Sequence, residues 1–235
     1  MFYNEDVVEI RNGVNRQQIE ISLDINEIFI NKIKKEVKEG HKILDLGTGN
    51  GYVLKQIQVN IPDKNLSLYG VDNSESMIAE CSKIESVIAV LSDNNHLPFE
   101  DEFFDIVTAK NVTRFSAEEL YRVLKPNGHF IFREYGKYKG LIEISKLFEN
   151  RLIRSRDCSY YYVLLKSVGF IEINIEEYII SRKFNSVDDV LKVVKSYPYI
   201  MDYSDKDEET IKKYLEENEK HLIIHSDPFI LVGGK

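Results

Sequence analysis

The sequence predicts an α/β fold in which a parallel sheet carries helices on both faces. Two observations support this prediction. Short β-type runs alternate with helical stretches between residues 43 and 132, and parallel strands need such crossover connections. In addition, the first of these runs leads directly into three closely spaced glycines, Gly47, Gly49 and Gly51. A glycine-rich turn between a buried strand and a helix is typical of ligand-binding α/β folds.

Composition narrows the class of protein. The 235 residues include 31 Lys and Arg against 39 Asp and Glu, a net charge of −8, and 43% are hydrophobic, enough for one full core. The acidic balance disfavours a general nucleic-acid binder. No apolar run is long enough to span a bilayer and no signal-peptide core is present, so no membrane association is expected. Cys81 and Cys158 lack metal-type spacing, which favours a metal-free enzyme in the reducing cytoplasm.

The first predicted element is a helix within residues 14–39, where apolar residues recur at helical spacing. Asp24 and Glu27 form a capping-box pattern, and Gly40 ends the stretch. A second capping-box pattern, Ser116 with Glu119, begins a later helix. The elements that follow Gly40 are expected in this order: strand 43–46, helix 52–59, strand 66–71, helix 74–83, strand 87–91, strand 104–108, helix 116–124 and strand 130–132.

The pattern changes after residue 135. Segment 137–156 has six basic and two acidic residues, a net charge of +4, and three tyrosines and a helix ending at Gly169 follow it. The elements expected next are a β-type run at 170–180, helices near 187–196 and 205–220, and an apolar run at 228–232. We therefore expect a helical cap at 1–39, a core formed by 40–180 and 228–235, and a helical insertion at 181–227 that acts as a lid.

The glycine loop itself has a chemical meaning. Without side chains, the three glycines let the backbone turn tightly and approach a ligand, and the helix that follows presents free N–H groups. A dinucleotide-binding loop would need the pattern Gly-x-Gly-x-x-Gly/Ala. Tyr52 stands at the last position of that pattern, which argues against NAD or NADP.

Acidic residues close the next two predicted strands. Asp72 ends the run Leu68–Asp72, 21 residues after Gly51. A carboxylate at this position can accept hydrogen bonds from both hydroxyls of a ribose. Asp93 lies in Ser92–Phe99, which closes the third strand, and its carboxylate can accept from an adenine amino group. Two more segments continue the series, namely Phe103–Val107 with Asn111 beyond it, and Glu119–Phe130.

Together these segments resemble the class I S-adenosylmethionine-dependent methyltransferases, in particular the type 11 methyltransferase domain, over about residues 40–135. The resemblance implies a Rossmann-like class I methyltransferase fold: a seven-stranded, mostly parallel sheet with helices on both faces. Its strand order is 3-2-1-4-5-7-6 with the last strand antiparallel, and in this chain a helical insertion precedes that last strand. S-adenosyl-L-methionine is the implied cofactor.

The resemblance also implies roles for individual residues. Asp45 would position the methionine amino group, Asp72 would hold the ribose, and Asp93 would face the adenine amine. Met77 would pack on the adenine face, although a core methionine is an equally good interpretation. The complete set of implied cofactor-binding residues is Asp45, Gly47, Thr48, Gly49, Gly51, Asp72, Asn73, Met77, Asp93, Asn94 and Lys110.

Catalytic residues are harder to assign, because the cofactor already carries an activated methyl group and a dedicated base is optional. His225 is a candidate general base, since its reference pKa suits proton removal near neutral pH. Glu134 and Tyr135, at the end of the fifth strand, are candidates for acceptor contact. The alternatives are local hydrogen bonding for the histidine, and packing or ion pairing for the other two.

The predicted function is methyl transfer to a small molecule or a peptide end. A neutral or anionic acceptor would be contacted by Arg154, Arg156 and Tyr160, because an arginine fork clamps carboxylates or phosphates and a tyrosine stacks on rings. Two alternatives remain open. One is an RNA methyltransferase that uses segment 137–156 as a strand-binding surface. The other is a non-catalytic subunit that binds S-adenosylmethionine and stabilises a partner.

Overall fold

The computed structural model describes residues 19–20, 22–153, 156–196, 199–218 and 222–235. The chain divides into two compact units. The larger unit comprises residues 25–134, 156–177 and 229–235, and the smaller unit comprises residues 1–24, 135–155 and 178–228. Among the described residues, no helix is both long and apolar enough to cross a membrane.

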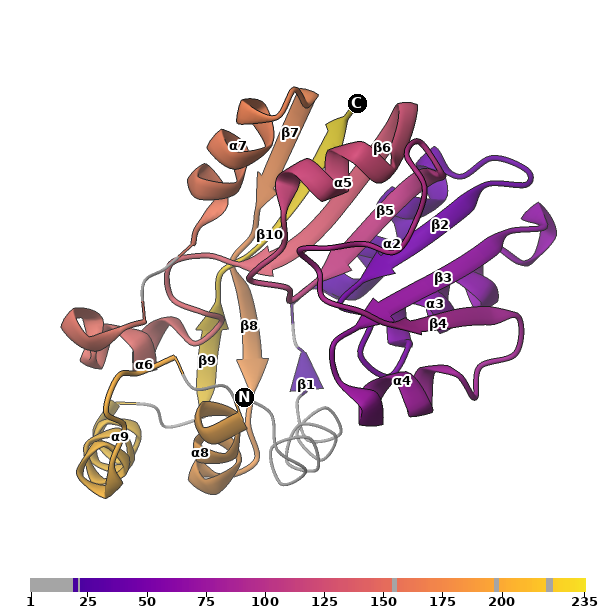
Figure 1. Cartoon of the computed structure of the whole chain (residues 1–235). Helices are drawn as coiled ribbons and strands as arrows, with labels where there is room; N and C mark the ends of the chain where they lie inside the picture. Colours follow the sequence, from indigo (N-terminus) through magenta and orange to yellow (C-terminus); the bar gives the residue numbers. More distant parts are fainter. Residues whose placement is uncertain (1–18, 21, 154–155, 197–198, 219–221) are drawn as a thin grey trace. The chain divides into compact units, whose positions relative to one another are not determined.

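The larger unit is built on a seven-stranded sheet in the order β4-β3-β2-β5-β6-β10-β7 (Figure 1). Neighbours from β4 through β6 pair in parallel, and β10 pairs with β7 antiparallel. This is the predicted order, 3-2-1-4-5-7-6, so the fold class is confirmed. The strands are β2 (Lys42–Leu46), β3 (Ser67–Asp72), β4 (Val87–Leu91), β5 (Phe104–Lys110), β6 (Leu124–Tyr135), β7 (Ile171–Glu177) and β10 (Pro228–Gly234).

Helices of the larger unit follow the predicted alternation. They are α2 (Ile25–Glu36), α3 (Tyr52–Asn60), the short 3₁₀ helix η1 (Pro62–Lys64), α4 (Glu75–Cys81), α5 (Ala117–Val123) and α7 (Cys158–Ser167). Ser74, Ser116 and Asp157 cap α4, α5 and α7, because their side chains accept from backbone N–H groups in the first turns of these helices. The capping box predicted at α5 is half formed, because Ser116 caps the helix while the Glu119 side chain bonds elsewhere.

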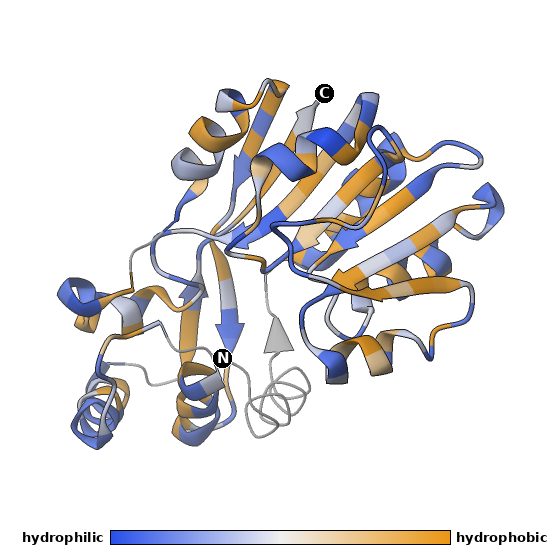
Figure 2. Ribbon diagram, viewed as in Figure 1, coloured by the Kyte–Doolittle hydropathy of each residue, from blue (hydrophilic) through white to orange (hydrophobic). Residues whose placement is uncertain are grey.

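The core of the larger unit lies where α5 and α7 cover the sheet. Leu120 from α5 and Leu165 from α7 are buried there with Leu44 and Leu46 from β2. Hydrophobic colour follows the strands in Figure 2, as expected for parallel strands covered on both faces. Aromatic rings fill much of the space, and the rings of Phe132 and Tyr161 meet edge to face with centroids 4.7 Å apart.

The smaller unit has its own sheet and its own core. Strands β1 (Ile19–Glu20), β8 (Ile180–Lys183) and β9 (Ile223–Ser226) form an antiparallel sheet in the order β1-β8-β9. The helices are α6 (Ile142–Leu147), the 3₁₀ helix η2 (Glu149–Arg151), α8 (Val187–Ser196) and α9 (Asp205–Asn218). Their apolar faces share a core with the strands, made of Leu141, Ile144, Phe148, Phe184, Val190, Leu191, Val194, Tyr199, Ile200, Ile211, Leu215 and Ile224.

This unit differs from the predicted organisation. The two helices of the insertion form as predicted, but the insertion also contributes β8 and β9. The run 170–180 contains β7 and the first residue of β8, and these two strands belong to different sheets. Of the predicted helix 14–39, residues 25–36 are helical and belong to the larger unit, while residues 1–18 and 21 lie outside the described residues.

Candidate cofactor-binding site

The glycine loop connects β2 to α3 at the carboxyl edge of the parallel strands. The N–H of Thr48 donates to the Val71 carbonyl over 2.8 Å, and the N–H of Gly51 donates to the Thr48 carbonyl over 3.0 Å. All three glycines have positive φ angles, 64° at Gly47, 55° at Gly49 and 80° at Gly51. Residues with a Cβ rarely adopt this conformation, so the tight path of the loop explains the glycine pattern.

The three glycines have different surroundings. A Cβ on Gly47 would lie 2.6 Å from a Val112 methyl, and a Cβ on Gly51 would collide with Ile84. A Cβ on Gly49 would have Met77 Sδ, 3.9 Å away, as its nearest neighbour. Gly47 and Gly51 therefore permit close packing of the chain, while Gly49 borders open space beside Met77.

Thr48, another predicted cofactor residue, is buried and packs on the neighbouring strand. Its methyl group lies 2.8 Å from the place that a Cβ on Gly70 would take. Glycine at position 70 therefore allows the loop to lie against the backbone of β3. The contact fixes the loop on the sheet and gives Thr48 a structural role.

Asp45 is fully buried in β2, one residue before the strand ends. The hydroxyl of Thr108 on β5 donates to its carboxylate over 2.8 Å. Burial raises the pKa of Asp45 to about 6, although the Thr108 hydrogen bond and the charge of Lys110 oppose the shift. The carboxylate is a strong candidate for binding an ammonium group, because a positive charge would relieve the cost of its burial.

Asp72 ends β3 and joins the glycine loop to α4. Its Oδ2 accepts from the N–H of Gly49 over 2.9 Å, and its Oδ1 accepts from the N–H of Ser74 over 3.0 Å. A carboxylate has about four lone-pair sites, so each oxygen can accept one further hydrogen bond. Asn73 is exposed beside it.

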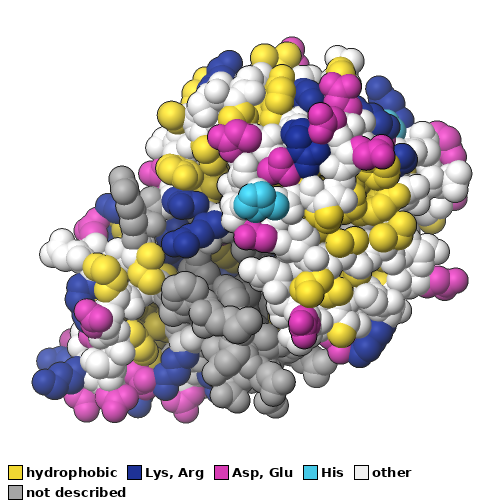
Figure 3. Space-filling model, viewed as in Figure 1, with side chains coloured by type: hydrophobic (Ala, Val, Ile, Leu, Met, Phe, Trp, Pro, Cys, Tyr) yellow, Lys and Arg dark blue, Asp and Glu magenta, His cyan; other side chains and the backbone are white. Residues whose placement is uncertain are grey.

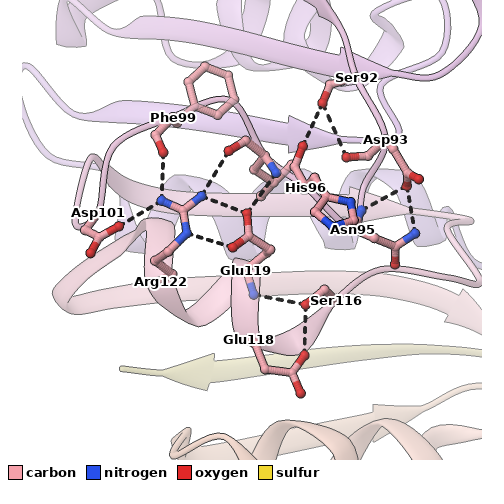
Figure 4. A network of polar contacts seen from close by, with 11 residues as sticks. Ser92, Asp93, Asn95, His96, Phe99, Asp101, Ser116, Glu118, Glu119 and Arg122 are labelled. Carbon is pink, nitrogen blue, oxygen red and sulfur yellow. Dashed lines mark hydrogen bonds and ion pairs between the residues drawn. The ribbon is translucent and has the colours of Figure 1, made fainter.

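The adenine-side candidates lie in the loop after β4. Asp93 is exposed, and its Oδ1 accepts from the backbone N–H and the side-chain amide of Asn95 over 2.9 and 2.7 Å (Figure 4). Asn94 lies against the glycine loop, with Nδ2 3.6 Å from the position of a Cβ on Gly47. Its Oδ1 is buried and has no hydrogen-bond partner among the described residues, so it is ready to accept from a ligand.

Lys110 ends β5 and points toward the first residue of α3. Its Nζ lies 4.6 Å from the centroid of the Tyr52 ring, a cation–π contact. In the sequence, Tyr52 only argues against a dinucleotide-binding loop. Its position at the start of the helix after the glycine loop is the signal that points to a place beside the site.

A cofactor with methionine, ribose and adenine parts fits these residues. The space at Gly49, the remaining lone pairs of Asp72, the buried carboxylate of Asp45 and the unpaired Asn94 oxygen are the supporting observations. A metal site is a different matter: within the described ranges, no group of three or more His, Cys, Asp or Glu side chains has metal-binding geometry.

The catalytic candidates have defined partners. His225 lies in β9, and Glu143 on α6 accepts from its backbone N–H over 2.8 Å and also contacts its ring Nδ1. The Tyr135 hydroxyl accepts from Arg182 over 2.8 Å. Glu134 is buried at the end of β6. Glu143 was missed by the sequence analysis, because 82 residues separate it from His225 and no motif links them.

The substrate candidates are separated by the structure. Arg154 lies outside the described residues, while Arg156 donates to the Thr113 carbonyl over 2.6 Å and stacks over the Tyr160 ring, with its Cζ 4.9 Å from the centroid. Two other basic residues of segment 137–156 form ion pairs, Lys137 with Glu149 and Arg151 with Asp207. Acidic and basic side chains are interspersed over the face drawn in Figure 3.

The chain is similar to known methyltransferases. Residues 44–132 match the family model described as a methyltransferase domain. The chain is 28% identical over 179 residues to the ubiquinone/menaquinone biosynthesis C-methyltransferase UbiE of Neisseria meningitidis, covering 65% of this chain and 70% of that protein.

Two solved structures share the fold. The YcgJ protein of Bacillus subtilis has a TM-score of 0.66 and 17% identity, with 89% of this chain and 98% of that chain covered. The phosphoethanolamine N-methyltransferase 2 of Haemonchus contortus, in complex with phosphomonomethylethanolamine and S-adenosylhomocysteine, has a TM-score of 0.57 and 18% identity, with 89% and 52% covered.

Proposed function

Because the chain belongs to the class I S-adenosylmethionine-dependent methyltransferases, we propose that it transfers a methyl group from S-adenosylmethionine to a nucleophilic atom of a small molecule. The observation that carries the proposal is the open space at Gly49, next to the Asp72 carboxylate and Met77, within the domain that matches the family. The relatives named above are a quinone-biosynthesis C-methyltransferase and a phosphoethanolamine N-methyltransferase.

The residues of this chain bind and orient the reactants. When bound, S-adenosylmethionine supplies a methyl group that its sulfonium has already activated. Asp72 would accept from the ribose hydroxyls, Asp93 from the adenine amine, and Asp45 from the methionine ammonium. Alignment of the acceptor with this methyl group contributes up to about 7–11 kcal/mol of the barrier reduction.

A proton must leave many acceptors when they are methylated, and His225 is our candidate to take it. The Glu143 carboxylate contacts Nδ1 of His225 and accepts from the backbone N–H of His225. These two contacts fix the imidazole ring and leave its Nε2 as the proton acceptor. The imidazole is 42% exposed and its glutamate partner 16%, so the ring edge is accessible while its support is largely enclosed.

The charges favour a small acceptor over RNA. Duplex and single-stranded nucleic acids are bound mainly by cations that neutralise phosphates. In segment 137–156, Lys137 and Arg151 already pair with carboxylates, and Arg156 already donates to a carbonyl. The net charge of the chain is −8.

Methyl transfer is tested with S-adenosylmethionine labelled in the methyl group and separate pools of small metabolites and total RNA. We expect label in the small-molecule pool and none in RNA. Label in RNA, together with RNA binding that weakens with salt at a log–log slope of about −0.7 per phosphate, would favour the RNA alternative. Cofactor binding without transfer to any pool would favour the non-catalytic subunit.

A further inference from the structure

All five N–H groups of Arg122 donate hydrogen bonds, and together they join α5 to the loop that follows β4 (Figure 4). Nε donates to Glu119 over 2.7 Å. Nη1 donates to the Phe99 carbonyl over 2.7 Å and to Asp101 over 2.9 Å, while Nη2 donates to the Leu97 carbonyl over 2.9 Å and to Glu119 over 2.7 Å. A guanidinium has five donors in a fixed planar fork, so none is left for a ligand.

Glu119 adds a further bond to the same loop. Its Oε2 accepts from the N–H of Leu97 over 2.8 Å as well as from the guanidinium. The hydrogen bonds from Arg122 lower the pKa of Glu119 to about 2, so the pair stays ionised at all ordinary pH values. The N–H of Ser116 completes the contact by donating to the Asn94 carbonyl over 3.2 Å.

These contacts follow the geometry of the helix. Positions 116, 119 and 122 are three residues apart, so they lie along one side of α5. From that side they hold the loop backbone at Asn94, Leu97 and Phe99. The loop is therefore fixed at several points by a neighbouring element.

The same loop carries Asp93 and Asn94, the residues assigned to the adenine under the proposed function. Hydrogen-bond discrimination between similar rings requires donors and acceptors that are held in place before binding. A loop free to shift could accommodate a purine with a carbonyl in place of the amino group. The network on α5 opposes such shifts without touching the ligand.

We propose that Glu119 and Arg122 are positioning residues that set the selectivity of the site for a 6-aminopurine, by holding residues 92–99 in one geometry. This inference rests on the proposed function. Lysine cannot replace Arg122, because an ammonium group has three donors and no planar fork.

The test compares two ligands that differ at one ring position, S-adenosylhomocysteine and S-inosylhomocysteine. Isothermal titration calorimetry gives both dissociation constants for the unmodified protein and for Arg122→Lys and Glu119→Gln. We expect the unmodified protein to prefer the adenine ligand by about tenfold or more, the usual range for a hydrogen bond to a charged group. In both variants this preference should fall to about threefold or less, while the affinity for the inosine ligand changes by less than about threefold.

Glu118→Gln is the matched control. Glu118 lies on the same turn of α5, and its carboxylate bonds only the Ser116 hydroxyl among the contacts drawn in Figure 4, so the preference should stay unchanged. Circular dichroism verifies folding of each variant, and Glu119→Gln decides the question if Arg122→Lys does not fold. Equal weakening of both ligands, or an unaltered preference, would overturn the positioning role.

Asp93→Ala separates this inference from the proposed function. If Asp93 faces the adenine amine, the substitution removes the preference. If the preference survives Asp93→Ala, the assigned adenine site is wrong. If it is lost in Asp93→Ala but kept in Arg122→Lys and Glu119→Gln, the site stands and the positioning role fails.

Discussion

The backbone N–H of Gly49 donates to Oδ2 of Asp72 over 2.9 Å, so the residue assigned to the ribose also holds the glycine loop. From the sequence alone, these two residues are separate contributors to one pocket. Their hydrogen bond couples them, because any change that moves the carboxylate also releases the part of the loop that borders the open space.

Asp72→Ala should therefore weaken binding of S-adenosylmethionine by at least ~1.5–3 kcal/mol, the typical loss for hydrogen bonds to a charged group. Asp72→Asn keeps the shape and one acceptor oxygen, so its loss should be smaller. Calorimetric titration measures both values, with circular dichroism to verify the fold. A dissociation constant in Asp72→Ala equal to that of the unmodified protein would refute the ribose assignment.

Alanine at Gly49 should affect mainly cofactor binding, whereas alanine at Gly51 should affect mainly stability. Both positions have positive φ, which costs alanine roughly 1 kcal/mol. At Gly49 the new methyl group enters open space, so cofactor affinity should fall more than stability. At Gly51 the methyl group meets Ile84 and Cys81, so stability should fall further.

Thermal unfolding and cofactor titration on the two glycine variants separate these effects. Gly40→Ala is the control, because its φ is also positive and no atom lies within 4 Å of the added Cβ. Equal loss of cofactor affinity in Gly49→Ala and Gly40→Ala would show that the space at Gly49 is not the ligand site.

Asp45 should make the stability of the protein depend on pH. Its pKa rises from 3.8 to about 6 in the folded state, so ionising it there costs about 3 kcal/mol relative to the unfolded chain. A carboxyl with a raised pKa favours folding while it is protonated. Its contribution to stability therefore falls as pH increases from about 4 to about 6 and is constant above that range.

Asp45→Asn removes this titration and should stabilise the free protein at pH 7, while it weakens cofactor binding if the carboxylate holds the methionine ammonium. The measurement is the free energy of unfolding in urea across pH 4–8, expressed as the difference between the variant and the unmodified protein. A difference that does not change with pH would contradict the raised pKa.

The regular part of the fold was predictable because each local signal agreed with the sheet. The glycines after β2, the acid at the end of β3 and Ser116 at the start of α5 all specify local geometry.

Contacts between distant residues were not predictable in the same way. The pairing of Glu143 with His225 joins α6 to β9 across 82 residues, and neither sequence neighbourhood indicates the other. Similarly, Glu119 was interpreted as half of a capping box, although its carboxylate bonds Arg122 and Leu97.

Removing either member of the Glu143–His225 pair should slow methyl transfer without affecting cofactor affinity. We expect His225→Asn to lower kcat by about 10²-fold, the lower range for general base catalysis. Glu143→Gln should cause a smaller loss, because its amide cannot accept from both the backbone N–H and Nδ1. Glu149→Gln is the control, since that exposed glutamate forms its ion pair with Lys137 and not with His225. An unaltered kcat for His225→Asn across the pH range would rule out the proton-accepting role.

The smaller unit should open as a cooperative unit distinct from the seven-stranded sheet. Among the described residues, its core cluster contains twelve buried residues, against twenty in the cluster beneath α5 and α7, and less buried apolar surface means a lower free energy of opening. Ile211 on α9 is fully buried in this core, so Ile211→Ala should cost about 2–5 kcal/mol locally. Hydrogen exchange should then become faster in α8, α9 and β9 while β2 and β5 keep their protection. Addition of S-adenosylhomocysteine and an acceptor should slow exchange in residues 181–227 if this insertion is the lid that the sequence predicts. Equal acceleration in β2 would show that the chain opens as one unit, and unchanged exchange on ligand addition would make the insertion a fixed support.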